Sequence, residues 1–344
     1  MKGVKPGAEK KALALHKEAT VTDFHCDTLK FVVEWPMIRG PLPERRRLGE
    51  RSNSGHIDLP RLIEGGVDCQ VFAVFTAREP RPQDAAILLI DAFYQSLDTN
   101  RDKLSLVLNL EEIKKANKEG KVAGLLSIEG GEPLLGSLAA LRVFYKLGIR
   151  AIGLTWSNRN ELGNGSGESR PTGGLTDFGV SVVEQANKLG MIVDVSHLND
   201  EGFWDVVGIN KGPFIASHSN CRSLCNNPRN LTDDMIKALA ERRGVMGMNF
   251  LPFFLLPRED ITSGKKATVK TIFDHIDHIV ELVGVDYIGL GSDYDGIPYP
   301  PDGLEDTSKM PNITLELVER GYSDNDVKKI LGDNFLRVID TVLK

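Results

Sequence analysis

Short apolar runs alternate with amphipathic stretches along most of the chain. Eight of these runs are four to seven residues long, mostly apolar or β-branched, and lack strict alternation. This pattern is typical of strands that are buried on both faces of a parallel sheet. The predicted strands are Val21–His25, Cys69–Phe75, Ala123–Ile128, Arg150–Leu154, Ile192–Val195, Phe214–Ser217, Val245–Asn249 and Tyr287–Gly291. A ninth run, Leu104–Leu108, is predicted to be an accessory strand.

Helical patterns lie between the predicted strands. Apolar residues recur at helical spacing in Leu138–Leu147, Phe178–Leu189, Thr232–Arg243 and Ile272–Val283, and a glycine follows each stretch. A glycine just past the last turn is a common helix stop. Strands that alternate with helices predict an α/β fold, and eight such strands favour a (β/α)8 TIM barrel. A doubly wound open sheet is the alternative, although no G-x-G-x-x-G motif follows the first strand.

The length of 344 residues alone would suggest roughly two domains, but α/β barrels of this size occur as one. We therefore expect a single barrel domain over residues 1–344, with an N-terminal helical extension at 1–20 that leaves His16 in solvent. Two irregular stretches, 34–59 and 157–176, follow the first and fourth strands. They are expected to be active-site loops, because barrel enzymes hold their sites at the C-terminal ends of the strands.

Composition narrows the class of protein. The chain is 41% hydrophobic and 26% charged, with a net charge of −6, which is typical of a soluble globular protein and gives no basic face for a nucleic acid. No apolar run approaches the roughly 20 residues of a membrane helix, and the N-terminal stretch lacks the apolar core of a signal peptide. With only four cysteines as well, we expect a cytoplasmic protein without membrane contact.

Residues capable of binding metal stand at the ends of five predicted strands. They are His25 with Asp27, then Glu129, His197, His218 and Asp293. A single histidine after a strand is more often structural, but five such ends would converge at one mouth of a barrel. Imidazole and carboxylate ligands together suit Zn²⁺, with Mn²⁺ or Co²⁺ as alternatives.

The spacing of these residues allows two ions. His25 and Asp27 are two positions apart, so in an extended chain both side chains point to the same side. Glu129 could bridge two ions, and His197 with His218 would complete the second site. Two ions about 3.5–4 Å apart would hold a hydroxide and polarise a carbonyl. Asp293 would then either transfer a proton or orient a ligand.

Six motifs occur in order along the chain. They are Asp-Phe-His-Cys-Asp (23–27), Ser-Ile-Glu-Gly-Gly (127–131), Val-Asp-Val-Ser-His (193–197), Ala-Ser-His-Ser-Asn (216–220), Asn-Asn-Pro-Arg-Asn-Leu (226–231) and Gly-Ser-Asp-Tyr-Asp-Gly (291–296). Each is weak alone, but the ordered set, from about Val21 to Leu336, resembles the membrane (renal) dipeptidase family. These are the M19 metallopeptidases with an amidohydrolase-like barrel, and the chain resembles a soluble member.

The resemblance implies a binuclear zinc dipeptidase with two Zn²⁺ per subunit. His25 and Asp27 would bind one zinc, His197 and His218 the other, and Glu129 would bridge them and take part in catalysis. Arg229 would bind the carboxylate of the dipeptide, and Asp293 would be the catalytic proton shuttle. The resemblance also implies attack by a metal-bridging hydroxide, tolerance of a D-residue at the C-terminal position, and a possible homodimer.

The chain departs from the family at one place near the expected site. Where the family often has a substrate-contacting histidine after the fourth strand, this sequence has Trp156. An indole donates one hydrogen bond and holds no charge, so Asn158 could supply a donor instead. The alternatives are a related metal-dependent hydrolase for an N-acyl amino acid, a cyclic amide or a lactone, and a non-catalytic binding protein.

Overall fold

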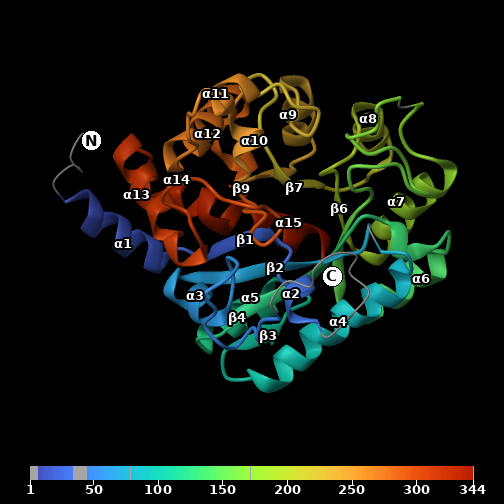
Figure 1. Ribbon diagram of the computed structural model, residues 1–344, viewed down its shortest axis with the longest axis horizontal. Helices are drawn as coiled ribbons and strands as arrows, with labels where there is room; N and C mark the ends of the chain where they lie inside the picture. The colour runs from blue at the N-terminus through green and yellow to red at the C-terminus, as the bar shows by residue number, and fades with distance from the viewer. Residues whose placement is uncertain (1–6, 34–44, 78, 171, 344) are drawn as a thin grey trace.

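The computed structural model describes residues 7–33, 45–77, 79–170 and 172–343. Nine strands run through this part of the chain, and every strand pairing is parallel (Figure 1). The strands are β1 (Val21–Cys26), β2 (Val67–Phe75), β3 (Leu104–Leu106), β4 (Val122–Glu129), β5 (Ile149–Gly153), β6 (Ile192–Asp194), β7 (Ile215–Ser219), β8 (Val245–Met248) and β9 (Ile288–Leu290).

Eight of the strands close into a barrel. Their order is β2-β1-β9-β8-β7-β6-β5-β4, and β2 pairs with β4 to complete the ring. The predicted (β/α)8 barrel is therefore confirmed, and the doubly wound open sheet is wrong. β3 is the accessory strand: it pairs with residues 122–124 of β4, whereas β5 pairs with residues 126–129 of β4.

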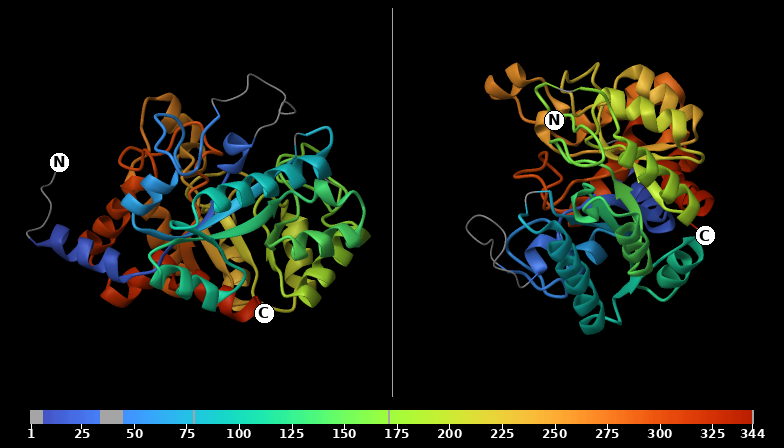
Figure 2. Two further views of the ribbon diagram at one scale, coloured as in Figure 1. Left: turned by 90° about the horizontal axis from the view of Figure 1, so that it is seen from below. Right: turned by 90° about the vertical axis from the view of Figure 1, so that its right-hand side faces the viewer.

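Helices surround the barrel, as the views in Figures 1 and 2 show. They are α1 (Ala8–Glu18), α2 (Leu29–Val32), α3 (Leu59–Glu64), α4 (Pro82–Thr99), α5 (Leu110–Lys118), α6 (Leu138–Lys146), α7 (Asp177–Leu189), α8 (Asp200–Ile209), α9 (Asp233–Glu241), α10 (Pro252–Leu255), α11 (Arg258–Thr262), α12 (Val269–Val283), α13 (Pro311–Arg320), α14 (Asp324–Lys328) and α15 (Asn334–Val342). None of the helices in the described part of the chain is both long and apolar enough to cross a membrane.

Two neighbouring strand pairs have very short ladders. Among the strand residues, β1 and β9 share one pair, Asp23 with Leu290, and β6 and β7 share one, Asp194 with Ile215. Buried aspartates add hydrogen bonds at both places. Asp23 accepts from the backbone N–H and the hydroxyl of Ser292, and Asp194 accepts from the backbone N–H and the hydroxyl of Ser217. Side chains thus supplement the backbone ladder where it is thinnest.

Helix α15 packs against the barrel interior. The ring of Phe335 stacks on Phe24 of β1, with 3.8 Å between the ring centroids and 5° between the planes. The close approach requires a glycine at position 289, because a Cβ there would lie 2.3 Å from the Phe335 ring. Val338 and Ile339 belong to the same buried cluster, so α15 closes one end of the barrel.

The expectation that His16 lies in solvent is wrong. The side chain is buried in α1, where Nδ1 lies 2.7 Å from the Thr314 hydroxyl of α13 and Nε2 lies 2.8 Å from the Gly65 carbonyl oxygen. A neutral ring with its proton on Nε2 satisfies both contacts. Burial lowers the pKa of His16, and the bond to Gly65 offsets this only partly.

This burial gives a stability prediction. Because the pKa of His16 is lower in the folded than in the unfolded chain, its contribution is present above about pH 6.5 and is lost as the pH falls. We expect His16→Gln to lower the melting temperature by a few degrees at pH 8, through weakened buried hydrogen bonds, and by less at pH 5.5. Calorimetry of both proteins at the two pH values measures this, and an equal loss at both would contradict it.

Candidate metal centre

Four of the predicted site residues meet at the C-terminal ends of the strands. Glu129 is the last residue of β4 and His25 the next to last of β1, whereas His218 lies in β7 and His197 follows β6. All four are buried, and the Nε2 atoms of His197 and His218 are 2.9 Å apart. The rings of His25 and His218 stack with centroids 3.7 Å apart. Residues almost 200 positions apart therefore form one cluster.

The two carboxylate oxygens of Glu129 face different histidines. Oε2 lies 3.4 Å from His25 Nε2, whereas Oε1 lies 3.1 Å from His197 Nε2 and 3.6 Å from His218 Nε2. A carboxylate placed in this way can offer one oxygen to each of two ions.

Asp27 and Asp293 lie on the His25 side of the cluster. Ligand atoms of His25, Asp27 and Asp293 lie within 4.8 Å of one another, as do those of His25, Glu129 and His218. Asn249 donates a hydrogen bond of 2.9 Å to Asp293 Oδ2, and Lys30 lies 3.3 Å from Asp27 Oδ2. The geometry thus adds Asp293 to the residues that can reach an ion at His25.

Hydrogen bonds from neighbouring residues fix the orientation of His218. The Ser217 hydroxyl donates to Asp194, so its oxygen accepts the proton of His218 Nδ1, 2.7 Å away. The Nε2 of His218 is then left without a proton and directs its lone pair toward Glu129. A relay of this type selects the tautomer that a metal ligand requires.

The charges of the cluster favour a cation. Burial, together with Arg229 for His197 and with His25 for His218, lowers the pKa of His197 to about 4 and that of His218 well below its usual value. Both rings are therefore neutral at pH 7. Burial acts in the same direction on His25, but Glu129 and the two aspartates outweigh it and raise its pKa to about 10.

The carboxyl groups respond to the same field. Burial would raise the pKa of Glu129, but His25 and His197 hold it well below its usual value. Burial raises the pKa of Asp293 to about 7, with His25 opposing the shift and Asp27 adding to it. Burial also raises the pKa of Asp27, against the effect of Lys30.

Unpartnered buried atoms show that these residues suit metal ions. His25 Nε2, Asp27 Oδ1, Glu129 Oε2 and His197 Nδ1 are buried and have no hydrogen-bond partner among the described residues. Leaving such groups unsatisfied costs about 1–3 kcal/mol each, and more when they are charged. Nitrogen and carboxylate donors of this kind are the set that binds Zn²⁺.

Two of the predicted site residues, His197 and Asp293, have a strained backbone conformation. His197 has a φ of 73° and Asp293 a φ of 60°, in the left-handed region that favours glycine. Such strain costs on the order of 1 kcal/mol and is concentrated at functional sites. Here it accompanies the turns that aim both side chains at the cluster.

Arg229 lies beside the histidines and keeps donors free. One terminal nitrogen donates to the Ser219 hydroxyl and the other to the His218 carbonyl oxygen, both at 2.7 Å. Its buried Nε has no partner in the described part of the chain, and each terminal nitrogen retains a second N–H. Burial lowers the pKa of Arg229 only to about 10, so it carries its charge at neutral pH.

Trp156 lies next to the cluster, and Asn158 lies farther out. The Trp156 ring centroid is 6.0 Å from that of His197 and 5.4 Å from that of Phe75. Asn158 is exposed and shares a pocket with Trp156. The described structure gives Asn158 no contact with the metal-binding residues.

Sequence reasoning missed the residues that support the cluster. Asp194 and Ser217 stand within the quoted motifs, but their roles depend on a contact between β6 and β7. Asn249 ends the predicted strand before that of Asp293, and a polar residue in that place was the available signal.

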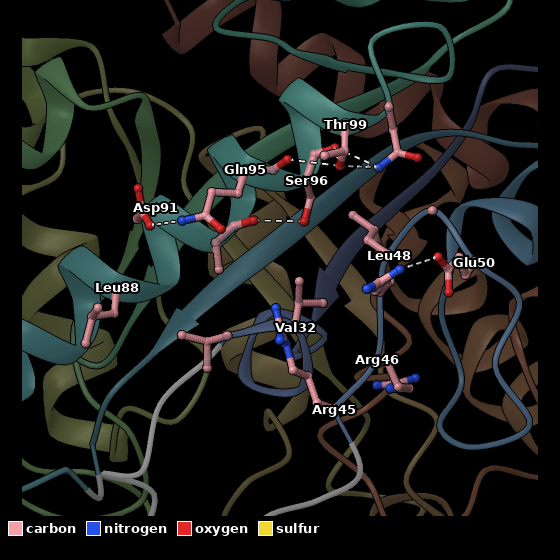
Figure 3. A pocket seen from close by; sticks show the side chains of 15 residues that line it. Val32, Arg45, Arg46, Leu48, Glu50, Leu88, Asp91, Gln95, Ser96 and Thr99 are labelled. Atoms are coloured by element: carbon pink, nitrogen blue, oxygen red, sulfur yellow. Dashed lines mark hydrogen bonds and ion pairs between the residues drawn. The ribbon is translucent and has the colours of Figure 1, made fainter.

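A separate cavity of about 550 Å³ lies between α2, residues 45–50 and α4 (Figure 3). None of the predicted site residues lines it. In Figure 3, the side-chain amide of Gln95 donates a hydrogen bond to the carboxylate of Asp91, so these two polar groups of the cavity wall are paired with each other.

Known proteins are similar to this chain in both sequence and fold. The sequence profile of the family described as "Membrane dipeptidase (Peptidase family M19)" matches residues 9–344. Dipeptidase verJ of Clonostachys rogersoniana is 32% identical over 351 aligned positions, which cover 96% of this chain and 86% of that protein. Dipeptidase tcpJ of Claviceps purpurea is 31% identical over 84% of this chain and 70% of that protein.

Solved structures agree with these matches. Dipeptidase AC, a metallopeptidase of family M19, superposes with a TM-score of 0.86 at 28% identity, covering 94% of this chain and 99% of that one. A metallopeptidase from Rhodobacter sphaeroides, solved with a phosphinate mimic of the dipeptide L-Ala-D-Ala, has a TM-score of 0.84 at 27% identity over the same shares. The chain therefore belongs to the membrane dipeptidase family, peptidase family M19, and is a metal-dependent dipeptidase.

Proposed function

We propose that this chain hydrolyses dipeptides with two zinc ions bound at the strand ends. The placement of Glu129 supports this most directly, because its two oxygens face two different sets of histidines. His25 and Asp27 would hold one ion, and His197 and His218 the other, with Glu129 between them. Bound zinc would supply Lewis-acid activation of the peptide carbonyl and of a water molecule at neutral pH.

Asp293 is proposed to move the proton of the reaction. A carboxylate oxygen of Asp293 would take a proton from the attacking water and return it to the nitrogen of the leaving amine. Asn249 supports this role, because its bond to Oδ2 fixes the carboxylate beside His25.

Arg229 is proposed to bind the C-terminal carboxylate of the dipeptide. Its free Nε and the second N–H of a terminal nitrogen provide the side-on pair of donors that matches a carboxylate. Recognition through the terminal carboxylate would limit the substrate to two residues. Tolerance of a D-residue at that position is part of the proposal, since the Rhodobacter sphaeroides metallopeptidase was solved with a mimic of L-Ala-D-Ala.

The proposal is tested by metal analysis together with a substrate panel. We expect two zinc ions per chain, release of amino acids from L-Ala-L-Ala and L-Ala-D-Ala, and loss of activity after chelation that zinc restores. The amide of L-Ala-L-Ala should be cleaved with a kcat/KM at least 100-fold lower, because Arg229 would meet no carboxylate.

Other members of the panel separate the remaining alternatives. Turnover of N-acyl amino acids, cyclic amides or lactones without any dipeptide cleavage would contradict the proposal and identify a related hydrolase. Absence of all turnover by the zinc-loaded protein would identify a binding protein. Equal cleavage of the dipeptide and its amide would contradict the role of Arg229.

A further inference from the structure

A pocket of about 300 Å³ opens beside the metal centre. Ala77, Pro82, Leu135 and the indole of Trp156 give it apolar walls, and Glu132 gives it a carboxylate. A long apolar stem with a cationic end would match this combination.

The pocket adjoins the cluster through two of its lining residues. Trp156 packs near His197 at a centroid distance of 6.0 Å. Glu132 begins the short 3-10 turn η1 (Glu132–Leu134), three residues after Glu129. Its carboxylate lies over Gly130, since a Cβ at that glycine would be 2.3 Å from Glu132 Oε2. A group in the pocket would therefore be close to a substrate held at the metal centre.

The carboxylate of Glu132 is only partly satisfied by the described residues. Oε2 is buried and has no hydrogen-bond partner among the residues that the structure describes. Burial raises the pKa of Glu132, whereas hydrogen bonds from its own backbone N–H and from Asn160 lower it, and Glu129 adds a smaller upward shift. Arg159 also lines the pocket, but its side chain bonds Asn164 and Thr172, and it makes no ion pair with Glu132 among the described residues.

We propose that this pocket binds the basic side chain of the N-terminal residue of a dipeptide, lysine or arginine. The inference rests on the proposed dipeptidase function. The aliphatic part of the substrate's side chain would lie along the ring of Trp156. Its cationic end would donate a charge-assisted hydrogen bond to the carboxylate of Glu132. Arg229 follows β7 and η1 follows β4, three strands away around the barrel. The carboxylate end of the dipeptide and the pocket thus lie on different sides of the centre.

The test compares two dipeptides that differ mainly in the terminal ammonium group. Lys-Ala and norleucine-Ala share a linear side chain, and the ratio of their kcat/KM values isolates the cation. We expect the zinc-loaded wild-type protein to prefer Lys-Ala about tenfold or more, and Glu132→Gln to reduce that ratio at least tenfold. Glu184→Gln is the control, because this carboxylate is exposed on α7 and does not line the pocket, and it should keep the ratio within about twofold.

Each outcome has one meaning. A wild-type ratio near one, with both dipeptides cleaved, overturns the inference and leaves the dipeptidase function intact. A Glu132→Gln protein with an unchanged ratio also overturns it. If neither dipeptide nor Ala-Ala is cleaved by the zinc-loaded protein, the proposed function itself fails. The wild-type ratio needs no variant, so a poorly folded Glu132→Gln protein does not remove the test.

Discussion

Replacing Glu129 by glutamine should lower kcat/KM for L-Ala-L-Ala by at least about 10³-fold, or roughly 4 kcal/mol of transition-state stabilisation. The side chain keeps its size but loses its charge and one of its two acceptor oxygens, so it no longer offers an oxygen to each ion. We expect the zinc content to fall from two ions per chain to one or fewer. Steady-state kinetics and elemental analysis of the same preparation measure both effects.

Glu184→Gln is the control for removing a carboxylate elsewhere. Glu184 is exposed on α7, so this variant should retain its zinc and its activity. The variant Glu129→Gln should also melt as one cooperative unit, because its neighbours are the ligands rather than the apolar core. Full activity with two zinc ions in Glu129→Gln would contradict the bridging role.

The second large effect is expected for Asp293→Asn. Asparagine has nearly the same shape but cannot take a proton, so kcat should fall by about 10²–10⁴-fold while KM changes little. If Asp293 moves the proton, the zinc content stays at two. The measurement is therefore kcat and KM together with zinc per chain.

The zinc content decides between the two roles that the geometry allows. Asp293 can also reach an ion together with His25 and Asp27. Loss of one zinc in Asp293→Asn would contradict the proton-transfer role and make Asp293 a ligand. Asp302→Asn is the control, since its side chain is exposed, and it should change neither quantity.

The strands of the barrel could be predicted because burial on both faces makes each one a nearly continuous apolar run. β4 is an example, with every residue from Val122 to Glu129 buried. The C-terminal ends of the strands could be predicted as well, since a polar residue that follows an apolar run is easily recognised in the sequence. Their convergence followed from the barrel alone, because parallel strands present all their C-terminal ends on one face.

Contacts between distant segments could not be predicted from the sequence. His16 is polar and stands in a lysine-rich helix, so nothing nearby indicates that Thr314, 298 positions later, covers it. The position of the Glu132 carboxylate depends on the absence of a side chain at Gly130. The roles of Arg229, Trp156 and Asn158 remain predictions, as does a homodimer.

The short ladders at β1–β9 and β6–β7 also bear on where the closed barrel is most weakly joined. They divide the barrel into two arcs, one formed by residues 21–194 and the other by residues 215–290, and each arc is a continuous stretch of chain. We expect the barrel to open first along these two seams, where the fewest backbone pairs join the arcs. His25 lies in the first arc, His197 follows the last strand of that arc, and His218 lies in the second arc. Bound ions would thus link ligands from both arcs. We therefore expect metal binding to slow the opening of the barrel.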